Sequence, residues 1–142
     1  MYDDVLIATD GSETADSAAE HAIAQAKRFG ATLHVVHAVA PGLTDVISSD
    51  SVGELVRDAE TNGEEIVENV AEKARAEGVE VRTHVEQRSP HEAVLEYAEE
   101  NGVDLIVVGS RGKSEKRLRD RLLGGVSTKV VYLSDVPVLT VR

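Results

Sequence analysis

The chain has 142 residues, of which 42% are hydrophobic and only 3% aromatic, and it contains no cysteine. Its length predicts a single domain over residues 1–142, with a core of Val, Ile, Leu and Ala. The 26 acidic residues exceed the 15 basic ones, which gives a formal net charge of −11. That charge argues against nucleic acid as a partner, because binding to a duplex depends on cations that neutralise its phosphates.

The same totals bear on where the protein works. The absence of cysteine excludes disulfides and thiolate metal sites, which fits a reducing, cytoplasmic location. No apolar run reaches the length of a membrane span, and the acidic start of the chain does not resemble a secretory signal. Lysine occurs only 5 times and arginine 10 times, so we expect a halophilic protein from a high-salt cytoplasm, where salt screens the charge. The alternative is an ordinary acidic mesophilic protein.

The first predicted strand is the apolar run 5–9, and it ends at Asp10-Gly11-Ser12. Ser12 is placed to cap the helix that follows, and Gly30 is placed to end it. The apolar residues of this helix recur at i, i+3 and i+4 positions, which is typical of a buried helix face. They are Ala15, Ala18, Ala19, Ala22, Ile23, Ala26 and Phe29.

A second strand is predicted over 32–39, followed by a polar, irregular loop over 43–52. A long helix then ends at Gly78, and Gly63 is expected to weaken it locally. Residues 79–85 alternate as a third strand. The apolar face of the long helix comprises Leu55, Ala59, Ile66, Val67, Val70 and Ala74.

The segment Ser89-Pro90-His91-Glu92 predicts the start of a third helix, with Ser89 as its cap, Pro90 in its first turn and Glu92 completing a capping box. This helix buries Ala93, Val94, Tyr97 and Ala98 and ends at Gly102. A strand over 105–108, a helix over 125–133 and a strand over 136–141 complete the chain. Each connection between strands contains a helix, so the sequence predicts an α/β three-layer sandwich with a doubly wound, five-stranded parallel sheet.

Ligands of such sheets bind beyond the carboxyl ends of the strands. Two strand ends stand out here, Asp10-Gly11-Ser12 and Gly109-Ser110-Arg111-Gly112. Glycines allow backbone N–H groups to approach an anion, so the second segment is a candidate phosphate loop. A basic run follows it, Lys113, Lys116, Arg117, Arg119 and Arg121. The alternative is a solvated surface loop.

Three common phosphate motifs are absent. Gly112-Lys113-Ser114 matches the end of a P-loop, but Val107 stands where its first glycine is needed. The first strand is not followed by the glycine fingerprint of dinucleotide-binding folds. The paired acids and late lysine of phosphoacceptor receiver domains are also missing.

Taken together, these segments resemble the universal stress protein family, specifically its nucleotide-binding branch. The resemblance covers nearly the whole chain and depends on the order and spacing of short motifs. They are Asp10-Gly11-Ser12, His37 late in the second strand, Ser89-Pro90-His91-Glu92, the run from Asp104 to Gly112, Leu122-Leu123-Gly124 and Val136-Pro137-Val138-Leu139.

The resemblance implies a Rossmann-like fold of the adenine nucleotide alpha-hydrolase-like type, with strand order 3-2-1-4-5. It also implies a bound adenine nucleotide, ATP with any Mg²⁺ carried by it, and a homodimer paired through the C-terminal strand. Asp10 would bind ribose or adenine groups, Ala38 and Val39 would contact the base, and the glycines would surround the phosphates. The implied nucleotide-binding residues are Ala8, Thr9, Asp10, Ala38, Val39, Gly109, Ser110, Arg111, Gly112, Gly124, Gly125, Val126 and Ser127.

The phosphate loop departs from the family pattern G-x2-G-x9-G-[ST]. Gly112 and Gly124 are separated by 11 residues, and Gly125 occupies the Ser/Thr position. The longer loop costs little closure entropy, and Ser127 or the backbone N–H of Gly125 would compensate for the missing hydroxyl.

Three functions remain open. The first is an ATP-binding regulatory protein of the stress response that acts as a homodimeric, nucleotide-dependent switch. The second is a nucleotide-free member that acts as a structural or interaction dimer. The third is an enzyme that transfers adenylyl or phosphoryl groups. No nucleophile–base pair or paired carboxylates are visible, so we expect no catalytic residues and at most slow ATP hydrolysis. His34 and His37 should face opposite sides of one strand, so we expect no histidine metal site.

Overall fold

A five-stranded parallel sheet forms the middle layer of the protein, as the sequence predicts, and its order β3-β2-β1-β4-β5 is the one that the family resemblance implies. The computed structural model describes residues 1–39, 50–110 and 125–142, and for residues 50–60 the backbone alone. The elements in chain order are β1 (Asp4–Ala8), α1 (Glu13–Phe29), β2 (Thr32–Val39), α3 (Asp50–Ala76), β3 (Val81–Gln87), α4 (Pro90–Glu100), β4 (Leu105–Gly109), α6 (Val126–Leu133) and β5 (Val138–Val141).

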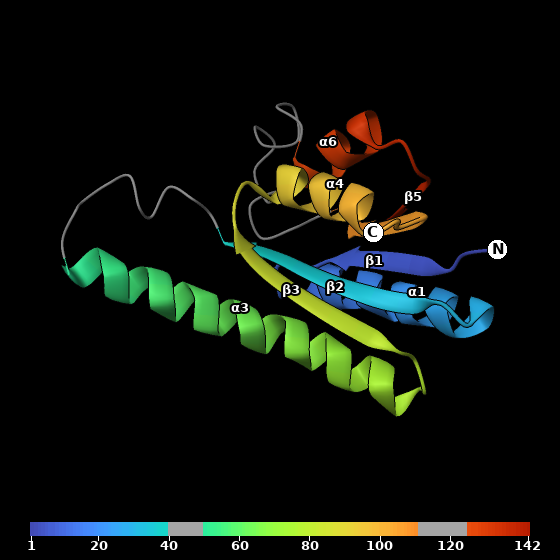
Figure 1. The fold of residues 1–142 in the computed structure, drawn as a ribbon, viewed down its shortest axis with the longest axis horizontal. Helices are drawn as coiled ribbons and strands as arrows, with labels where there is room; N and C mark the ends of the chain where they lie inside the picture. The colour runs from blue at the N-terminus through green and yellow to red at the C-terminus, as the bar shows by residue number, and fades with distance from the viewer. Residues whose placement is uncertain (40–49, 111–124) are drawn as a thin grey trace.

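Helices cover both faces of the sheet (Figure 1). Helices α1 and α3 lie against one face, and α4 and α6 lie against the other. The alternation of side chains along β1 shows how both faces are filled: Val5 and Ile7 join the core under α1 and α3, whereas Leu6 joins the core under α4 and α6. All three side chains are fully buried. A strand buried on both faces must be continuously apolar, as in the predicted first strand.

Helix α1 begins and ends where the sequence predicts. The Ser12 hydroxyl accepts a hydrogen bond of 3.2 Å from the backbone N–H of Ala15, and Gly30 ends the helix in the left-handed conformation with φ +66°. The predicted alanine-rich face is buried along its length. Phe29 is the exception, since it is 37% exposed and packs edge-on against Tyr2 rather than in the core.

Other boundaries differ from the predictions. Strand β3 lies two residues further toward the C-terminus than predicted, and its first residue, Val81, pairs with Leu33 of β2. Residues 50–52, predicted as loop, already belong to α3, and residues 43–49 of that loop lie outside the described residues. Strand β5 begins at Val138 rather than at residue 136.

The predicted capping box at α4 is not formed, although Ser89 and Pro90 are placed as predicted. Glu92 pairs with Arg88 instead. Ser89 has the extended conformation of a helix cap, and Pro90 is in the first turn. However, the Ser89 hydroxyl makes no capping hydrogen bond to the helix backbone. The start of α4 therefore depends on the fixed φ of Pro90 and on burial of Ala93 and Val94.

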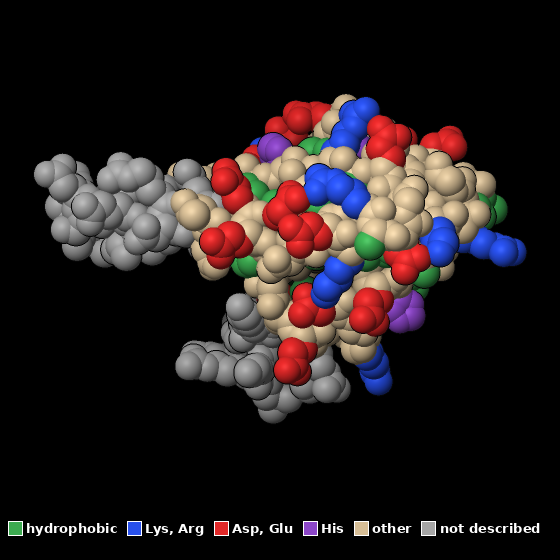
Figure 2. Space-filling model, turned by 90° about the horizontal axis from the view of Figure 1, so that it is seen from below, with side chains coloured by type: hydrophobic (Ala, Val, Ile, Leu, Met, Phe, Trp, Pro, Cys, Tyr) green, Lys and Arg blue, Asp and Glu red, His purple; other side chains and the backbone are tan. Residues whose placement is uncertain are grey.

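The charge excess is visible on the surface. Figure 2 shows Asp and Glu side chains spread over one face, with Lys and Arg side chains scattered singly among them. Glu64, Glu65, Glu99 and Glu100 are exposed on their helices. In the part of the chain that the structure describes, no helix is long and apolar enough to cross a membrane.

Candidate functional site

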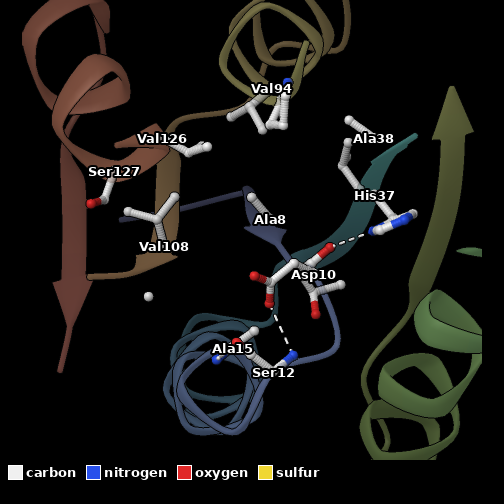
Figure 3. A pocket seen from close by; sticks show the side chains of 14 residues that line it. Ala8, Asp10, Ser12, Ala15, His37, Ala38, Val94, Val108, Val126 and Ser127 are labelled. Carbon is white, nitrogen blue, oxygen red and sulfur yellow. Dashed lines mark hydrogen bonds between the residues drawn. The ribbon is translucent and has the colours of Figure 1, made fainter. Parts of the chain in front are cut away.

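A cavity opens at the carboxyl ends of β1, β2 and β4, where helices α1 and α6 begin (Figure 3). Seven of the nucleotide-binding residues proposed from the sequence line it: Ala8, Thr9, Asp10, Ala38, Gly109, Val126 and Ser127. The cavity also has lining residues that the sequence did not single out for this site: Ser12, Ala15, Val36, His37, Pro90, Val94 and Val108.

The register of the parallel strands brings these distant segments together. The Cα of Ala8 pairs with Val36 on β2 and with Val108 on β4. Strand β1 ends in this row, whereas β2 continues to Val39, so the turn after β1 lies beside the last residues of β2. Ala8 lies between Val36 and Val108 in the middle of the sheet, and its small side chain leaves space for the cavity.

A tight turn holds Asp10 at the mouth of the cavity. The N–H of Thr9 donates to the Val36 carbonyl at 3.0 Å, which fixes the turn to β2. The N–H of Gly11 donates to the Thr9 hydroxyl at 3.1 Å, and the N–H of Ser12 donates to Oδ1 of Asp10 at 2.9 Å. Gly11 has φ +78°, which other residues rarely adopt. The turn therefore presents one carboxylate next to the start of α1.

The start of α6 faces the cavity from the opposite side. Gly125 is its cap and supplies no side-chain acceptor to the first turn, so backbone N–H groups at this end are left for another acceptor. Val126 and Ser127 of this turn line the cavity, and Ser127 is 7% exposed. A helix start with uncapped N–H groups attracts anions such as phosphate.

Gly109 brings the end of β4 against the start of α1. A Cβ atom on Gly109 would lie 3.0 Å from Cγ2 of Thr14 and 3.2 Å from the Thr14 carbonyl oxygen. The absence of a side chain thus lets the strand end and the helix pack closely on this side of the cavity. The next residue, Ser110, donates its N–H to the Val141 carbonyl at 2.7 Å and so joins the ends of β4 and β5.

The remaining proposed residues fall elsewhere. Val39 is buried in the core, 4% exposed, and is not part of the described lining. Ser110 and Gly125 are next in sequence to the lining residues Gly109 and Val126, but they do not line the cavity themselves. Arg111, Gly112 and Gly124, together with the basic run between them, lie outside the described residues.

Some of the lining residues could have been found from the sequence. Val36 and Val108 follow once Ala8 is aligned with its neighbours in a parallel sheet. Pro90 and Val94 could not be found so easily, because they reach the cavity through the packing of α4 on the sheet, which no local pattern encodes. Their positions one helical turn apart on α4 place both on the same helix face.

The chemistry of the cavity is largely apolar. Aliphatic side chains form most of its wall, and among the described lining residues Asp10 is the only acid and His37 the only ionisable base. Within the described ranges 1–39, 50–110 and 125–142, no three His, Cys, Asp or Glu side chains are grouped so that they could hold a metal ion. The cavity therefore combines an apolar wall with a few polar groups, which is typical of a site for a small molecule.

The chain is similar to known proteins over nearly its whole length. The universal stress protein YxiE of Bacillus subtilis is 37% identical over the full length of both chains. The solved structure of MJ0577, a universal stress protein of Methanocaldococcus jannaschii, has a TM-score of 0.82 and 31% identity, covering 99% of this chain and 96% of that one.

A universal stress protein solved in complex with cAMP has a TM-score of 0.75 and 26% identity, covering 99% of this chain and 97% of its own. The model of the universal stress protein family matches residues 1–142. The chain therefore belongs to the universal stress protein family.

Proposed function

We propose that this single-domain protein binds an adenine nucleotide, ATP, at the cavity described above, and acts in the stress response as a nucleotide-dependent switch. The observation that carries the proposal is the arrangement of one carboxylate, Asp10, and one uncapped helix start, α6, on opposite sides of an apolar cavity. The similar protein solved with cAMP supports the same class of ligand.

Each part of the cavity suits one part of the nucleotide. The aliphatic side chains of Ala38, Val94 and Val126 offer an apolar surface to the base. The Asp10 carboxylate can only accept hydrogen bonds, and ribose hydroxyls can donate them. The N–H groups at the start of α6 are donors for phosphate oxygens. Any Mg²⁺ would arrive with the ATP phosphates, since the described residues offer no metal site of their own.

A second candidate is a nucleotide-free family member that works only as an interaction dimer. The observation that favours it lies in the sequence: 11 residues separate Gly112 from Gly124, and Gly125 replaces a hydroxyl-bearing residue. A missing charge-assisted hydrogen bond would weaken binding of the phosphates.

Nucleotide content and calorimetry distinguish the two. The protein is purified in high salt without added nucleotide and denatured, and the supernatant is assayed for adenine nucleotides. Calorimetric titration with Mg-ATP follows for wild type, Asp10→Asn and Asp16→Asn. The amide in Asp10→Asn can still accept from Ser12 but has lost its charge, so we expect binding about 10-fold or more weaker. Asp16→Asn removes the same charge from an exposed position in α1 and should bind normally. No nucleotide and no heat with wild type would favour the second candidate.

We also propose a homodimer formed at the β5 edge of the sheet. Next to that strand, the end of α6 exposes three hydrophobic side chains, Val131 (49%), Tyr132 (87%) and Leu133 (60%). Apolar side chains beside an open sheet edge favour pairing with a second copy. Light scattering should show a dimer for wild type and a monomer for Tyr132→Glu/Leu133→Glu. Both side chains are exposed, so the variant should fold, and a dimeric variant would contradict this interface.

We further propose that the protein is halophilic and cytoplasmic. The net charge of −11 and the scarcity of lysine support this, because self-repulsion of an acidic surface is screened at high ionic strength. Urea unfolding at low and at molar KCl tests it. The free energy of unfolding should rise strongly with KCl, and an unchanged value would indicate an ordinary acidic protein.

A further inference from the structure

The imidazole ring of His37 lies beside the turn that carries Asp10 (Figure 3). Its Nδ1 atom is 2.8 Å from the carbonyl oxygen of Thr9 (Figure 3). A carbonyl oxygen can only accept, so Nδ1 carries the proton and donates it. This bond joins β2 to the first residue after β1, which is the residue immediately before Asp10.

The same ring is held from its other side by helix α3. Gly63 of α3 is buried, and a Cβ atom placed on it would lie 2.7 Å from Cδ2 of His37 and 3.1 Å from Cγ1 of Val85. Only a glycine leaves room for the ring at this point. The glycine that the sequence marks as a weak point of the helix is therefore the place where α3 packs against His37, one of the residues that line the cavity.

These contacts form a chain from α3 to the site. Gly63 leaves space for the ring of His37, and Nδ1 of that ring donates to the Thr9 carbonyl. The Thr9 hydroxyl accepts from the N–H of Gly11, and the Thr9 N–H donates to the Val36 carbonyl of β2. Ile66, one turn further along α3, lies beside this turn, since its side chain would be 3.1 Å from a Cβ placed on Gly11. Helix α3 thus lies against His37 at one point and beside Gly11 at another.

We propose that His37 is a positioning residue for the nucleotide site, which acts by fixing the turn from Thr9 to Ser12, and that Gly63 is required so that its ring can do so. The inference about binding rests on the proposed function. The inference about the turn does not, because it concerns hydrogen bonds made by the protein alone.

Four variants separate this role from a general effect on stability. His37→Leu keeps an apolar side chain but removes the donor, whereas His37→Asn retains an N–H donor at the δ position. Gly63→Ala favours the helix by propensity but displaces the ring. Glu65→Ala changes an exposed position of the same helix and is the matched control.

Calorimetric titration with Mg-ATP gives the first readout. We expect binding to weaken about 3- to 10-fold in His37→Leu and in Gly63→Ala, to recover in His37→Asn and to be unchanged in Glu65→Ala. Adding Gly63→Ala to His37→Leu should weaken binding no further, because the two changes break the same hydrogen bond. Wild-type affinity in His37→Leu, or fully additive losses in the double variant, would overturn the proposal.

Amide hydrogen exchange gives a readout that needs no nucleotide. The N–H groups of Gly11 and Ser12 should exchange faster in His37→Leu and Gly63→Ala than in wild type, and at the wild-type rate in His37→Asn and Glu65→Ala. If wild type binds no adenine nucleotide, the proposed function fails, but the exchange rates still show whether His37 fixes the turn. Unchanged exchange of both amides in His37→Leu would refute this role of His37.

Discussion

The Nδ1 atom of His34 lies 2.8 Å from the hydroxyl of Tyr97, and the ring of His34 is 1% exposed. On its other side, Nε2 of His34 lies 2.9 Å from Oδ1 of Asp4. An ionised carboxylate only accepts, so in the neutral ring Nε2 carries the proton and Nδ1 accepts from Tyr97. A buried histidine thereby has a partner for both nitrogens, and it joins β1, β2 and α4.

Replacing Tyr97 by phenylalanine should therefore destabilise the protein. The variant keeps the ring that packs against His34 and His84 but leaves Nδ1 buried without a donor. Such a loss costs about 1–3 kcal/mol. Urea unfolding measures it, and Tyr132→Phe is the control, since Tyr132 is 87% exposed. Equal stability of the two variants would mean that the Tyr97 hydroxyl contributes nothing.

Tyr97 should also make the stability depend on alkaline pH. Burial raises the pKa of Tyr97 above its ordinary value of 10.0, and the charge of Asp4 acts in the same direction while Arg82 opposes it. The folded protein then holds this proton more tightly than the unfolded chain. The stabilisation is complete below pH 10 and is lost as the pH rises through the folded pKa. Absorbance titration of tyrosinate should show a late-ionising group that disappears in Tyr97→Phe. If all three tyrosines titrate together near 10, the prediction is wrong.

The His34 and His37 side chains illustrate how far the sequence alone can lead. Their spacing on one strand predicts opposite faces, and the structure confirms it: His34 contacts Tyr97 of α4, and His37 lies against Gly63 of α3. The alanine face of α1 was likewise predictable, because it follows from local periodicity. The strand order was implied by the resemblance to the universal stress protein family, because neither periodicity nor the handedness of crossovers fixes which strands are neighbours.

What escaped prediction depends on contacts between segments far apart in the chain. Gly63 is weak by helix propensity, and only the position of His37 shows why a side chain cannot be accommodated there. Phe29 continues the apolar spacing of α1, yet it is partly exposed because Tyr2 offers it a partner outside the core. Pro90 and Val94 line the cavity only because α4 packs across the sheet end. None of these contacts has a local signature.

Gly109 is predicted to tolerate no side chain. In Gly109→Ala the new Cβ would approach both Cγ2 and the backbone oxygen of Thr14, and the backbone cannot move without shifting α1. Overpacking of this kind costs about 1–3 kcal/mol. Urea unfolding should show the loss, and adding Thr14→Ser should recover part of it by removing Cγ2. Full stability in Gly109→Ala alone would show that the strand end and α1 can separate without cost.

The ion pair between Lys27 and Glu77 should account for part of the loss of stability in acid. Nζ of Lys27 lies 2.7 Å from Oε2 of Glu77, and it joins the last turn of α1 to the residue that follows α3. The hydrogen bond from Lys27, followed by its positive charge, holds the pKa of Glu77 below the ordinary value of 4.5. A carboxyl with a lowered folded pKa stabilises the protein above its unfolded pKa, and this contribution is lost as the pH falls through the folded value.

Glu77→Gln removes the titrating group while keeping its shape. Wild type should be more stable than this variant at neutral pH, and the difference should shrink to nothing as the pH falls below 4.5. Because both side chains are largely exposed, the difference should also be small and should fade in high salt. Urea midpoints measured from neutral to acidic pH, at low and at molar KCl, test both trends. Glu80→Gln is the control for loss of an exposed carboxylate close by in the sequence. A difference that persists in acid would show that the carboxylate acts through something other than its charge.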